Sequence, residues 1–389
     1  MNKLFEFGQY WDTGTFLLFF FIGCIIALLS KMGSRQNVLS YNFYGVIVNS
    51  QKKKRIQGRD ICYILIFLII FSVYSFRSEE VGADTPGYVL LFKNTTELKF
   101  EMNVIFPTLN LYEPLFMLIT YMVRKITDNY TIYFMVFGTI LAYSYTKFFK
   151  TFWTSESGHI FLIAFSSQLF YDLNVMRSAL GTAFILLSIC AILKGKEKKA
   201  YLLTFIGIMF HFTVIVNIPL LFLLHIVDKK EIISKKKLVF YISSGIIILL
   251  AFVPLSRMYL GSSKYQSYLG NVTTVNIWGL WNVLVTIVLS IIILFRRNYI
   301  DKKGRILAIS GIYDIITLLL VVKIGMYRVV TYYEIIRLAL WGTVEEKQNK
   351  HNRWILGICF FIIIIVFLLF KMSRYSSSPG FVYKTILIK

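Results

Sequence analysis

Long apolar runs follow one another along most of this chain, separated by short blocks of lysine and arginine. The runs include residues 15–30, 61–76, 130–149 and 354–370. Hydrophobic residues make up 57% of the 389 residues and charged residues only 16%, a balance that excludes an ordinary soluble domain of this size. Repeated runs of this kind are typical of polytopic membrane proteins. We therefore expect an all-α integral membrane protein in which residues 1–389 form a single transmembrane domain.

The net charge of +22 is carried mainly by basic blocks between the apolar runs. The densest of these blocks are residues 52–59, 194–199 and 229–237. Basic loops of this kind lie on the cytoplasmic side of a membrane, so the charge is explained without nucleic acid. The resulting topology has about twelve transmembrane helices and both termini outside, in a multi-pass protein of the cytoplasmic membrane.

Two apolar stretches do not fit a simple succession of spans. Residues 113–126 would reach only about 21 Å as a helix, short of the roughly 30 Å hydrocarbon core. Because a full span there would put the later basic blocks outside, we expect a re-entrant or interfacial helix. Residues 200–227 lie between two basic blocks but are too short for two full spans. We expect a hairpin of two shortened helices that turns near His211 and lines a cavity or is buried in protein.

The outer side of this topology carries the longest polar segment, residues 77–112, and a tyrosine-rich loop, residues 254–276. We expect both loops to contribute to an outer-face cavity, because a long loop rich in aromatic residues is more often functional than disordered. The four cysteines lie within apolar runs without metal-ligand spacing, so neither a disulfide framework nor a metal site is indicated. The sequence carries no nucleotide-binding motif, so we expect no cofactor. If the protein is a transferase, its donor must therefore be activated in the membrane.

Residues 170–181 join two apolar runs and carry Asn174 and Arg177. If a helix begins near Asp172, both lie on one of its faces. An arginine in the first turn opposes the helix dipole, so it is not there for helix stability. Either Arg177 and the backbone N–H groups of the helix start bind an anion such as phosphate, or Arg177 snorkels to the lipid headgroups. Arg77 and Arg328 also stand singly at outer ends of apolar runs, and the three together favour a shared anionic ligand.

Three residues are candidates for a general base. His211 is either a buried histidine hydrogen-bonded to a carbonyl group or a proton carrier that faces the outer cavity. Asp84 and Glu113 are outer carboxylates beside the membrane, and a carboxylate can do the same work. Glu113 is followed by Pro114, so it also has the pattern of a helix start.

Five short motifs resemble those of the EpsG-like, Wzy-type bacterial polysaccharide polymerases. In chain order, they contain Arg77 with Asp84 and Tyr88, Glu113 with Pro114, Asn174 with Arg177, His211 between Phe210 and Phe212, and Arg328 with Tyr332 and Tyr333. The similarity covers residues 60 to about 342. The chain departs from that family's pattern at Ser178, where glutamine is expected, and at Gly181, where alanine is expected.

The resemblance implies a fold like that of multispanning glycosyltransferases with polyprenyl-linked donors. Such an enzyme works at the outer face of the bacterial cytoplasmic membrane and transfers a growing glycan from polyprenyl diphosphate to a hydroxyl of the next lipid-linked repeat unit. The expected base is one of His211, Asp84 and Glu113. The arginines would stabilise the diphosphate leaving group. The expected substrate-binding residues are Arg77, Tyr88, Asn174, Arg177, Arg328 and Tyr332.

The expected partners are membrane lipid, the polyprenyl-diphosphate-linked oligosaccharide, and flippase and chain-length regulator proteins. The sequence has no second acid beside Asp84, which argues against a metal. Two alternatives stay open: a flippase or transporter of lipid-linked oligosaccharide, and a non-catalytic subunit of an export machine. The long outer loop and the absence of an internal repeat favour the enzyme.

Overall fold

The structure is a computed structural model, and it describes residues 9–42, 58–96, 113–153, 158–228, 301–324, 328–346, 350–376 and 379–387. These residues form helices and no strand, apart from an isolated bridge between Arg77 and Thr385. The all-α prediction is confirmed for this part of the chain. The predicted outer loop 254–276, residues 97–112 of the other outer loop and the basic block 229–237 lie outside the described residues.

The helices pack into two units, each assembled from segments that are far apart in the sequence. Unit 1 comprises Met1–Gly87, Phe134–Val175 and Trp341–Lys389, and unit 2 comprises Tyr88–Tyr133 and Met176–Leu340. A single transmembrane domain over residues 1–389 stays a prediction.

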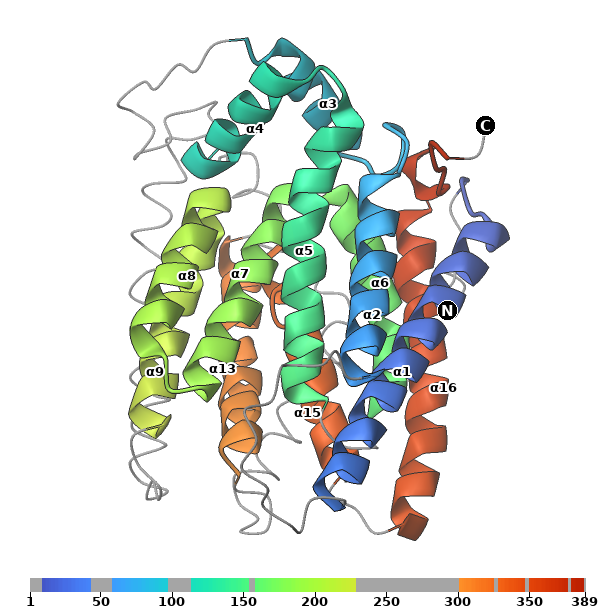
Figure 1. Cartoon of the computed structure of the whole chain (residues 1–389), viewed down its shortest axis with the longest axis vertical. Coiled ribbons are helices and arrows are strands. Elements are labelled where there is room, and N and C mark those ends of the chain that lie inside the picture. Colours follow the sequence, from blue (N-terminus) through green and yellow to red (C-terminus); the bar gives the residue numbers. More distant parts are fainter. Residues whose placement is uncertain are drawn as a thin grey trace, which may run out of the picture. The chain divides into compact units, whose positions relative to one another are not determined.

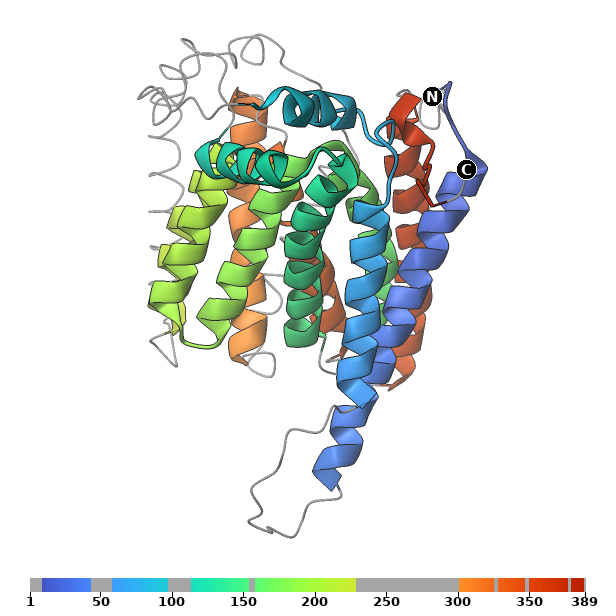
Figure 2. The same cartoon turned by 45° about the horizontal axis from the view of Figure 1, so that its top comes forward.

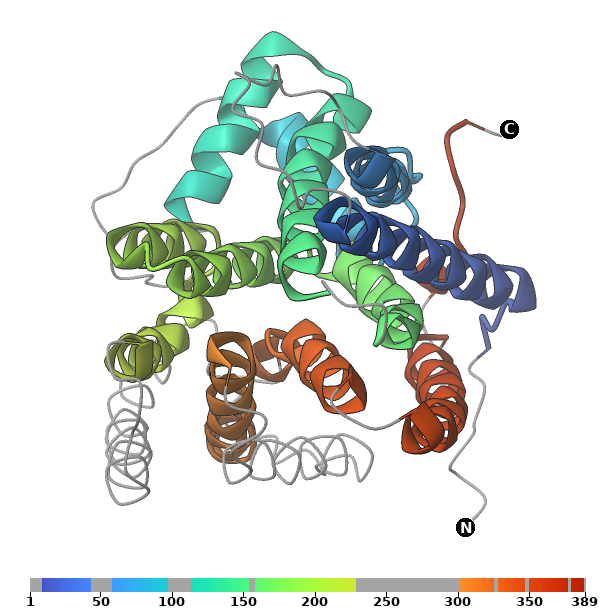
Figure 3. The same cartoon turned by 60° about the horizontal axis from the view of Figure 1, so that its bottom comes forward.

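Unit 1 is built around α6, which lies between α1 and α16 (Figures 1 and 3). Every residue of α6 is buried, and its polar side chains Gln168 and Asp172 are hydrogen-bonded to each other at 2.8 Å. The elements of this unit are α1 (Thr13–Asn42), α2 (Gly58–Ser75), most of α5 (Tyr130–Phe152), η2 (His159–Phe161), α6 (Leu162–Asn174), α16 (Lys350–Tyr375) and η5 (Pro379–Phe381). The short helix α3 (Thr85–Asn94) begins in unit 1 and continues into unit 2.

Unit 2 is built around the pair α7 and α8, which pack side by side, with α4 lying across their ends (Figure 2). Its elements are α4 (Pro114–Ile126), α7 (Met176–Leu193), α8 (Glu197–Phe210), η3 (Phe212–Asn217), α9 (Ile218–Asp228), α13 (Lys302–Ile324), α14 (Arg328–Thr331) and most of α15 (Glu334–Glu346). The short α4 confirms a separate helix after Glu113. Its re-entrant or interfacial placement stays a prediction.

The predicted hairpin that turns near His211 is confirmed. The helix α8 ends at Phe210, the 3₁₀ turn η3 follows, and α9 begins at Ile218. The two arms return to the same level, because Nδ1 of His225 in α9 is 2.7 Å from Oε2 of Glu197 in the first turn of α8.

The condition that a helix begins near Asp172, which would place Asn174 and Arg177 on one face, is not met. The helix α6 continues to Asn174, Val175 leaves helical geometry (φ −133°, ψ 59°), and α7 begins at Met176. The amide of Asn174 donates to the carbonyl of Phe170 inside α6, so its side chain supports the end of the earlier helix. Asn174 and Arg177 therefore belong to different helices.

Three helices of the described chain contain segments long and apolar enough to cross a membrane: Thr13–Ser34, Gly58–Ser75 and Met176–Leu193. The first two also expose large apolar side chains such as Phe21, Leu28 and Ile64. Such surfaces suit contact with lipid, in agreement with a membrane protein. The total of about twelve spans, the cytoplasmic membrane and the orientation of the termini stay predictions.

Candidate functional site

Glu113 is the N-cap residue of α4, and its carboxylate does not cap that helix. Its backbone is extended (φ −61°, ψ 145°), Pro114 occupies the first helical position, and the Glu113 side chain makes no capping hydrogen bond. The predicted helix start is therefore confirmed, since proline there loses no intrahelical hydrogen bond. The carboxylate, only 9% exposed, contacts other helices of unit 2 instead.

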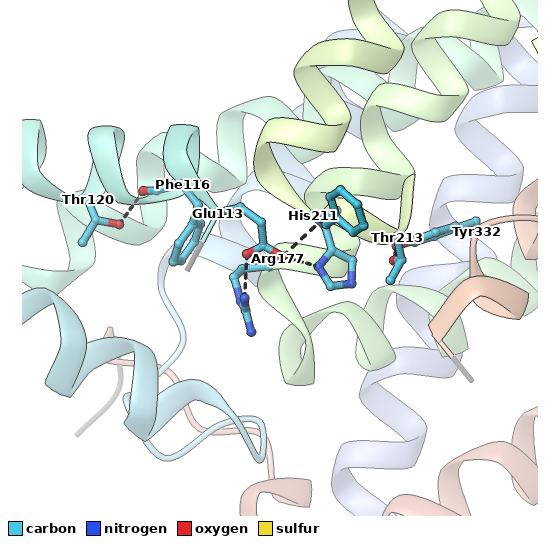
Figure 4. Close-up of polar contacts among 8 residues, drawn as sticks. Glu113, Phe116, Thr120, Arg177, His211, Thr213 and Tyr332 are labelled. Atoms are coloured by element: carbon cyan, nitrogen blue, oxygen red, sulfur yellow. Dashed lines mark hydrogen bonds and ion pairs between the residues drawn. The ribbon is translucent and has the colours of Figure 1, made fainter. Parts of the chain in front are cut away.

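One carboxylate joins three elements of unit 2 (Figure 4). Nη1 of Arg177, in the first turn of α7, lies 2.6 Å from Oε2 of Glu113. On the other oxygen, Nδ1 of His211 lies 2.9 Å from Oε1, and the backbone N–H of Phe212 donates to the same atom at 3.4 Å. Glu113, Arg177 and His211 thus form a triad.

The triad fixes the ionisation of its carboxylate. Burial by itself raises the pKa of Glu113, but the hydrogen bond with His211 and the charge of Arg177 outweigh it, and the pKa lies well below its usual range. An ionised carboxylate can only accept hydrogen bonds, so Nδ1 of His211 is the donor. In the neutral imidazole, the lone pair then lies on Nε2, at the opposite edge of the ring.

His211 is held in place by the break between α8 and η3. Its backbone is extended (φ −157°, ψ 111°), and its N–H donates to the carbonyl of Gly207 at 2.9 Å. The side chain is 3% exposed and presents its ring to Tyr332 edge to face, with ring centroids 6.5 Å apart. The sequence allowed His211 to be a buried histidine hydrogen-bonded to a carbonyl group. In the structure, the partner of its Nδ1 is instead the carboxylate of Glu113.

Gly181 of α7 makes room for this turn. A Cβ atom at that position would lie 2.7 Å from Cγ2 of Val214 and 3.4 Å from Cβ of His211. A hydrogen in place of a side chain thus allows η3 to approach α7 closely. Gly181, where the resemblance led us to expect alanine, therefore lies against the turn that carries His211.

Arg177 points into unit 2. Its side chain is 11% exposed and is paired with Glu113, and the hydroxyl of Tyr88 lies within hydrogen-bonding reach of it. Tyr88 is itself 3% exposed, so the guanidinium is enclosed by protein. This arrangement differs from a side chain that snorkels to headgroups, which keeps its charge in a wet environment.

Three tyrosines fasten the turn η3. The hydroxyl of Tyr332 is hydrogen-bonded to Oγ1 of Thr213 (Figure 4). The hydroxyl of Tyr333 donates to Oδ1 of Asn217, and that of Tyr313 donates to the carbonyl of Val216. Tyr332 was expected from the sequence as a substrate contact, and in the structure its hydroxyl also holds the segment that follows His211.

Sequence reasoning missed a buried ion pair in the same unit. Nε of Arg337 in α15 lies 2.6 Å from Oδ2 of Asp314 in α13, and the two side chains are 5% and 0% exposed. The signal was present, because both charges stand inside apolar runs where a charge is costly unless it is paired. The sequence could not show that these two charges pair, because that depends on the packing of α13 against α15.

Three of the predicted site residues lie in unit 1. Asn174 accepts a hydrogen bond from the backbone N–H of Ala83 at 2.8 Å, and Oγ1 of Thr85 donates to the carbonyl of Leu173 at 3.1 Å. These contacts hold the loop that carries Asp84, which is half-buried. Arg77, the third, is fully buried beside the same loop. The side chain of Arg328 lies outside the described residues.

Metal-ion ligands do not cluster in the described part of the chain. No group of three or more His, Cys, Asp and Glu residues in it could hold a metal ion.

The model of one protein family, described as the EpsG family, matches residues 60–385. This range includes all three triad residues and extends beyond residue 342, where the resemblance was expected to end. No curated protein and no solved structure matches the chain.

Proposed function

Because this chain belongs to the EpsG family of polysaccharide polymerases, we propose that it polymerises lipid-linked oligosaccharide repeat units at the outer face of the bacterial cytoplasmic membrane. The growing glycan passes from polyprenyl diphosphate to a hydroxyl of the next repeat unit. The single observation that supports this mechanism is the triad, in which a histidine, a carboxylate and an arginine meet in a buried site. Flippase and chain-length regulator proteins are proposed partners.

In the proposed reaction, the acceptor hydroxyl attacks the anomeric carbon of the donor. A bond forms between the acceptor oxygen and that carbon, and the bond between the carbon and the diphosphate oxygen breaks. The electron pair leaves with the diphosphate, and the acceptor proton passes to Nε2 of His211. General-base help of this kind contributes about 10²–10⁴-fold to a rate.

Glu113 is a positioning residue in this proposal. Its low pKa makes it a weak base, while its negative charge accepts the Nδ1–H of His211 and directs the lone pair to Nε2. The same charge stabilises the imidazolium that forms when His211 takes the proton. Asp84, the remaining candidate base, lies in unit 1.

Arg177 provides the positive charge for the leaving group. Diphosphate gains negative charge as its bond to the sugar breaks, and a fixed cation in a water-poor site stabilises that charge without reorganisation. Glu113 holds both Arg177 and His211 through its two oxygens, so the cation and the base are supported by one group. Tyr88, Arg328 and Tyr332 are proposed as further substrate contacts.

The location of unfinished substrate tests this function. Deletion of the gene is expected to leave single lipid-linked repeat units at the outer face of the membrane, where an added glycosidase can reach them. Restoring the wild-type chain should return polymer, and restoring His211→Asn should not, although the protein is inserted. Repeat units trapped on the cytoplasmic side would contradict the proposal and indicate a flippase.

A further inference from the structure

The ion pair of Arg337 and Asp314 ties two helices of unit 2 together. Asp314 belongs to α13 and Arg337 to α15, and 2.6 Å separate Nε of the arginine from Oδ2 of the aspartate. The side chains are 5% and 0% exposed. Burying two charges costs free energy that their attraction regains only in part, and apolar side chains of similar size often give an equally or more stable fold. Stability is therefore a weak explanation for this pair.

A buried tyrosine stands beside each charge. Tyr313 directly precedes Asp314 in α13. Tyr333 lies four residues before Arg337, and its carbonyl accepts the backbone N–H of that arginine at 2.8 Å. The rings of the two tyrosines contact each other, with centroids 6.1 Å apart. The ion pair and the tyrosines thus form one packed cluster, in which a shift of α13 against α15 displaces both rings.

The two tyrosine hydroxyls hold the far end of η3. The hydroxyl of Tyr313 donates to the carbonyl of Val216, and that of Tyr333 donates to Oδ1 of Asn217. Asn217 is 1% exposed, and its Nδ2 donates to the carbonyl of Val214 at 3.2 Å. The amide of Asn217 therefore connects the cluster to the middle of the turn.

Val214 continues this connection to His211. Its backbone N–H donates to the carbonyl of His211 at 3.0 Å. Its side chain is packed closely against two helices, because a Cβ atom at Gly181 of α7 would lie 2.7 Å from its Cγ2, and one at Gly207 of α8 would lie 3.2 Å from its Cγ1. A short turn packed this tightly has little room to absorb a displacement, so a shift at its far end reaches His211.

We propose that Asp314 and Arg337 are positioning residues for His211. Their ion pair fixes α13 against α15, and the two tyrosines carry that geometry to the far end of η3. Glu113 holds the imidazole at the near end, so the proposed base is supported from both sides. An ion pair suits this task because its hydrogen-bonding geometry specifies one register between two helices, which apolar contacts specify less strictly. All of these residues belong to unit 2.

This role deepens the proposed function and rests on it. A general base must come within about 2.6–3.2 Å of the group whose proton it takes. A misplacement of about 1 Å, caused by a change far from the reacting atoms, costs roughly 10²-fold in rate. The ion pair acts on the chemical step, so its loss should lower kcat and leave KM unchanged.

Replacing both charges at once, in Asp314→Leu with Arg337→Met, removes the pair without leaving a buried charge. The variant is expected to unfold at the wild-type temperature or above, while its kcat falls by roughly 10²-fold. The matched control is Glu197→Gln with His225→Gln, since that pair also joins two helices of unit 2 but lies at the other end of the hairpin from η3. The control should turn over as wild type. Wild-type kcat in the folded Asp314 and Arg337 variant would overturn the proposal.

A second variant decides if the first does not fold. Tyr313→Phe with Tyr333→Phe keeps the ion pair and both rings but removes the hydroxyls that hold η3. Its kcat should fall while KM stays as in wild type. An unchanged kcat in this variant would show that the cluster does not position the base.

Replacing His211 separates a positioning role from a general structural one. If the pair acts through His211, its loss should have no further effect in the His211→Asn background, because changes within one functional unit are not additive. Single-turnover rates of the two backgrounds measure this. An equal fold loss with and without His211 would refute the proposal.

Hydrogen exchange tests the same idea without substrate. In Asp314→Leu with Arg337→Met, the backbone amides of residues 211–217 should exchange faster than in wild type, and those of α7 should exchange at the wild-type rate. This result in a chain that makes no polymer would support the positioning of η3 and refute only the polymerase. Unchanged exchange across residues 211–217 would overturn the positioning role and leave the polymerase proposal standing.

Discussion

Replacing Glu113 with glutamine removes the negative charge that balances Arg177 and accepts the hydrogen bond of His211. The shape of the side chain is kept, so the effect reports on charge more than on packing. Arg177 would then be a buried cation without its carboxylate, and the ring of His211 would no longer be held to one tautomer. We therefore expect losses of both stability and activity.

The expected size of both losses follows from burial. The side chains of Arg177 and Glu113 are 11% and 9% exposed, so solvent screens the pair little. Breaking a buried pair by removing one partner costs about 3–5 kcal/mol of unfolding free energy. The transfer rate should fall by roughly 10²–10⁴-fold, the usual contribution of an oriented general base. Removing both charges, in Glu113→Gln with Arg177→Met, should recover most of the stability but none of the activity.

The stability effect should depend on pH in one direction. The pKa of Glu113 in the folded protein lies below the unfolded value, which is about 4.3 for a glutamate. Its contribution to folding is therefore fully present above that value and is lost as the pH falls further. The stability difference between wild type and Glu113→Gln should be largest at neutral pH and shrink on acidification.

Thermal unfolding of the purified protein in detergent measures the first quantity, and turnover of a lipid-linked repeat unit measures the second. Glu80→Gln is the matched control, since Glu80 pairs with Lys384 at the surface, where the side chains are 66% and 59% exposed. That variant should behave as wild type. If Glu113→Gln also has the melting temperature and turnover of wild type, the triad has no energetic role. The same conclusion follows if the stability lost by the double variant equals the sum of the stability losses of the two single variants.

Further substitutions test the other assignments. His211→Asn should slow transfer by about 10²–10⁴-fold, and near-normal turnover in it, with none in Asp84→Asn, would move the base to Asp84. Arg177→Lys keeps the charge but not the planar fork, so most polymer should be lost from an inserted protein, and normal polymer would reduce Arg177 to a counter-ion of the carboxylate. Gly181→Leu should displace the turn that carries the histidine, lowering melting temperature and turnover together, and a wild-type melting temperature would contradict the close approach. Cysteines in the block at Lys194, on a cysteine-free background, should resist an impermeant thiol reagent in intact cells, and labelling there would overturn the topology.

Much of the organisation of this chain could be predicted from residues close together in the sequence. The apolar runs predicted helices in a membrane protein, and the order of short motifs identified the family. The pair Glu113–Pro114 predicted where α4 begins, and the short apolar stretch around His211 predicted a broken hairpin. Helix starts, breaks and lengths are local properties, so a pattern of a few residues is enough to reveal them.

Side-chain partners were decided by packing. Glu113 precedes Arg177 by 64 residues and His211 by 98, and no periodicity connects them. The backbone also separated Asn174 from Arg177, since a break at Val175 ends one helix before the next begins at Met176. Packing also enclosed Arg77 between rings from α2 and α5, which meet because Gly138 has no side chain. The sequence supplies the charges, but only the tertiary structure decides which of them meet, because a contact depends on how distant helices pack.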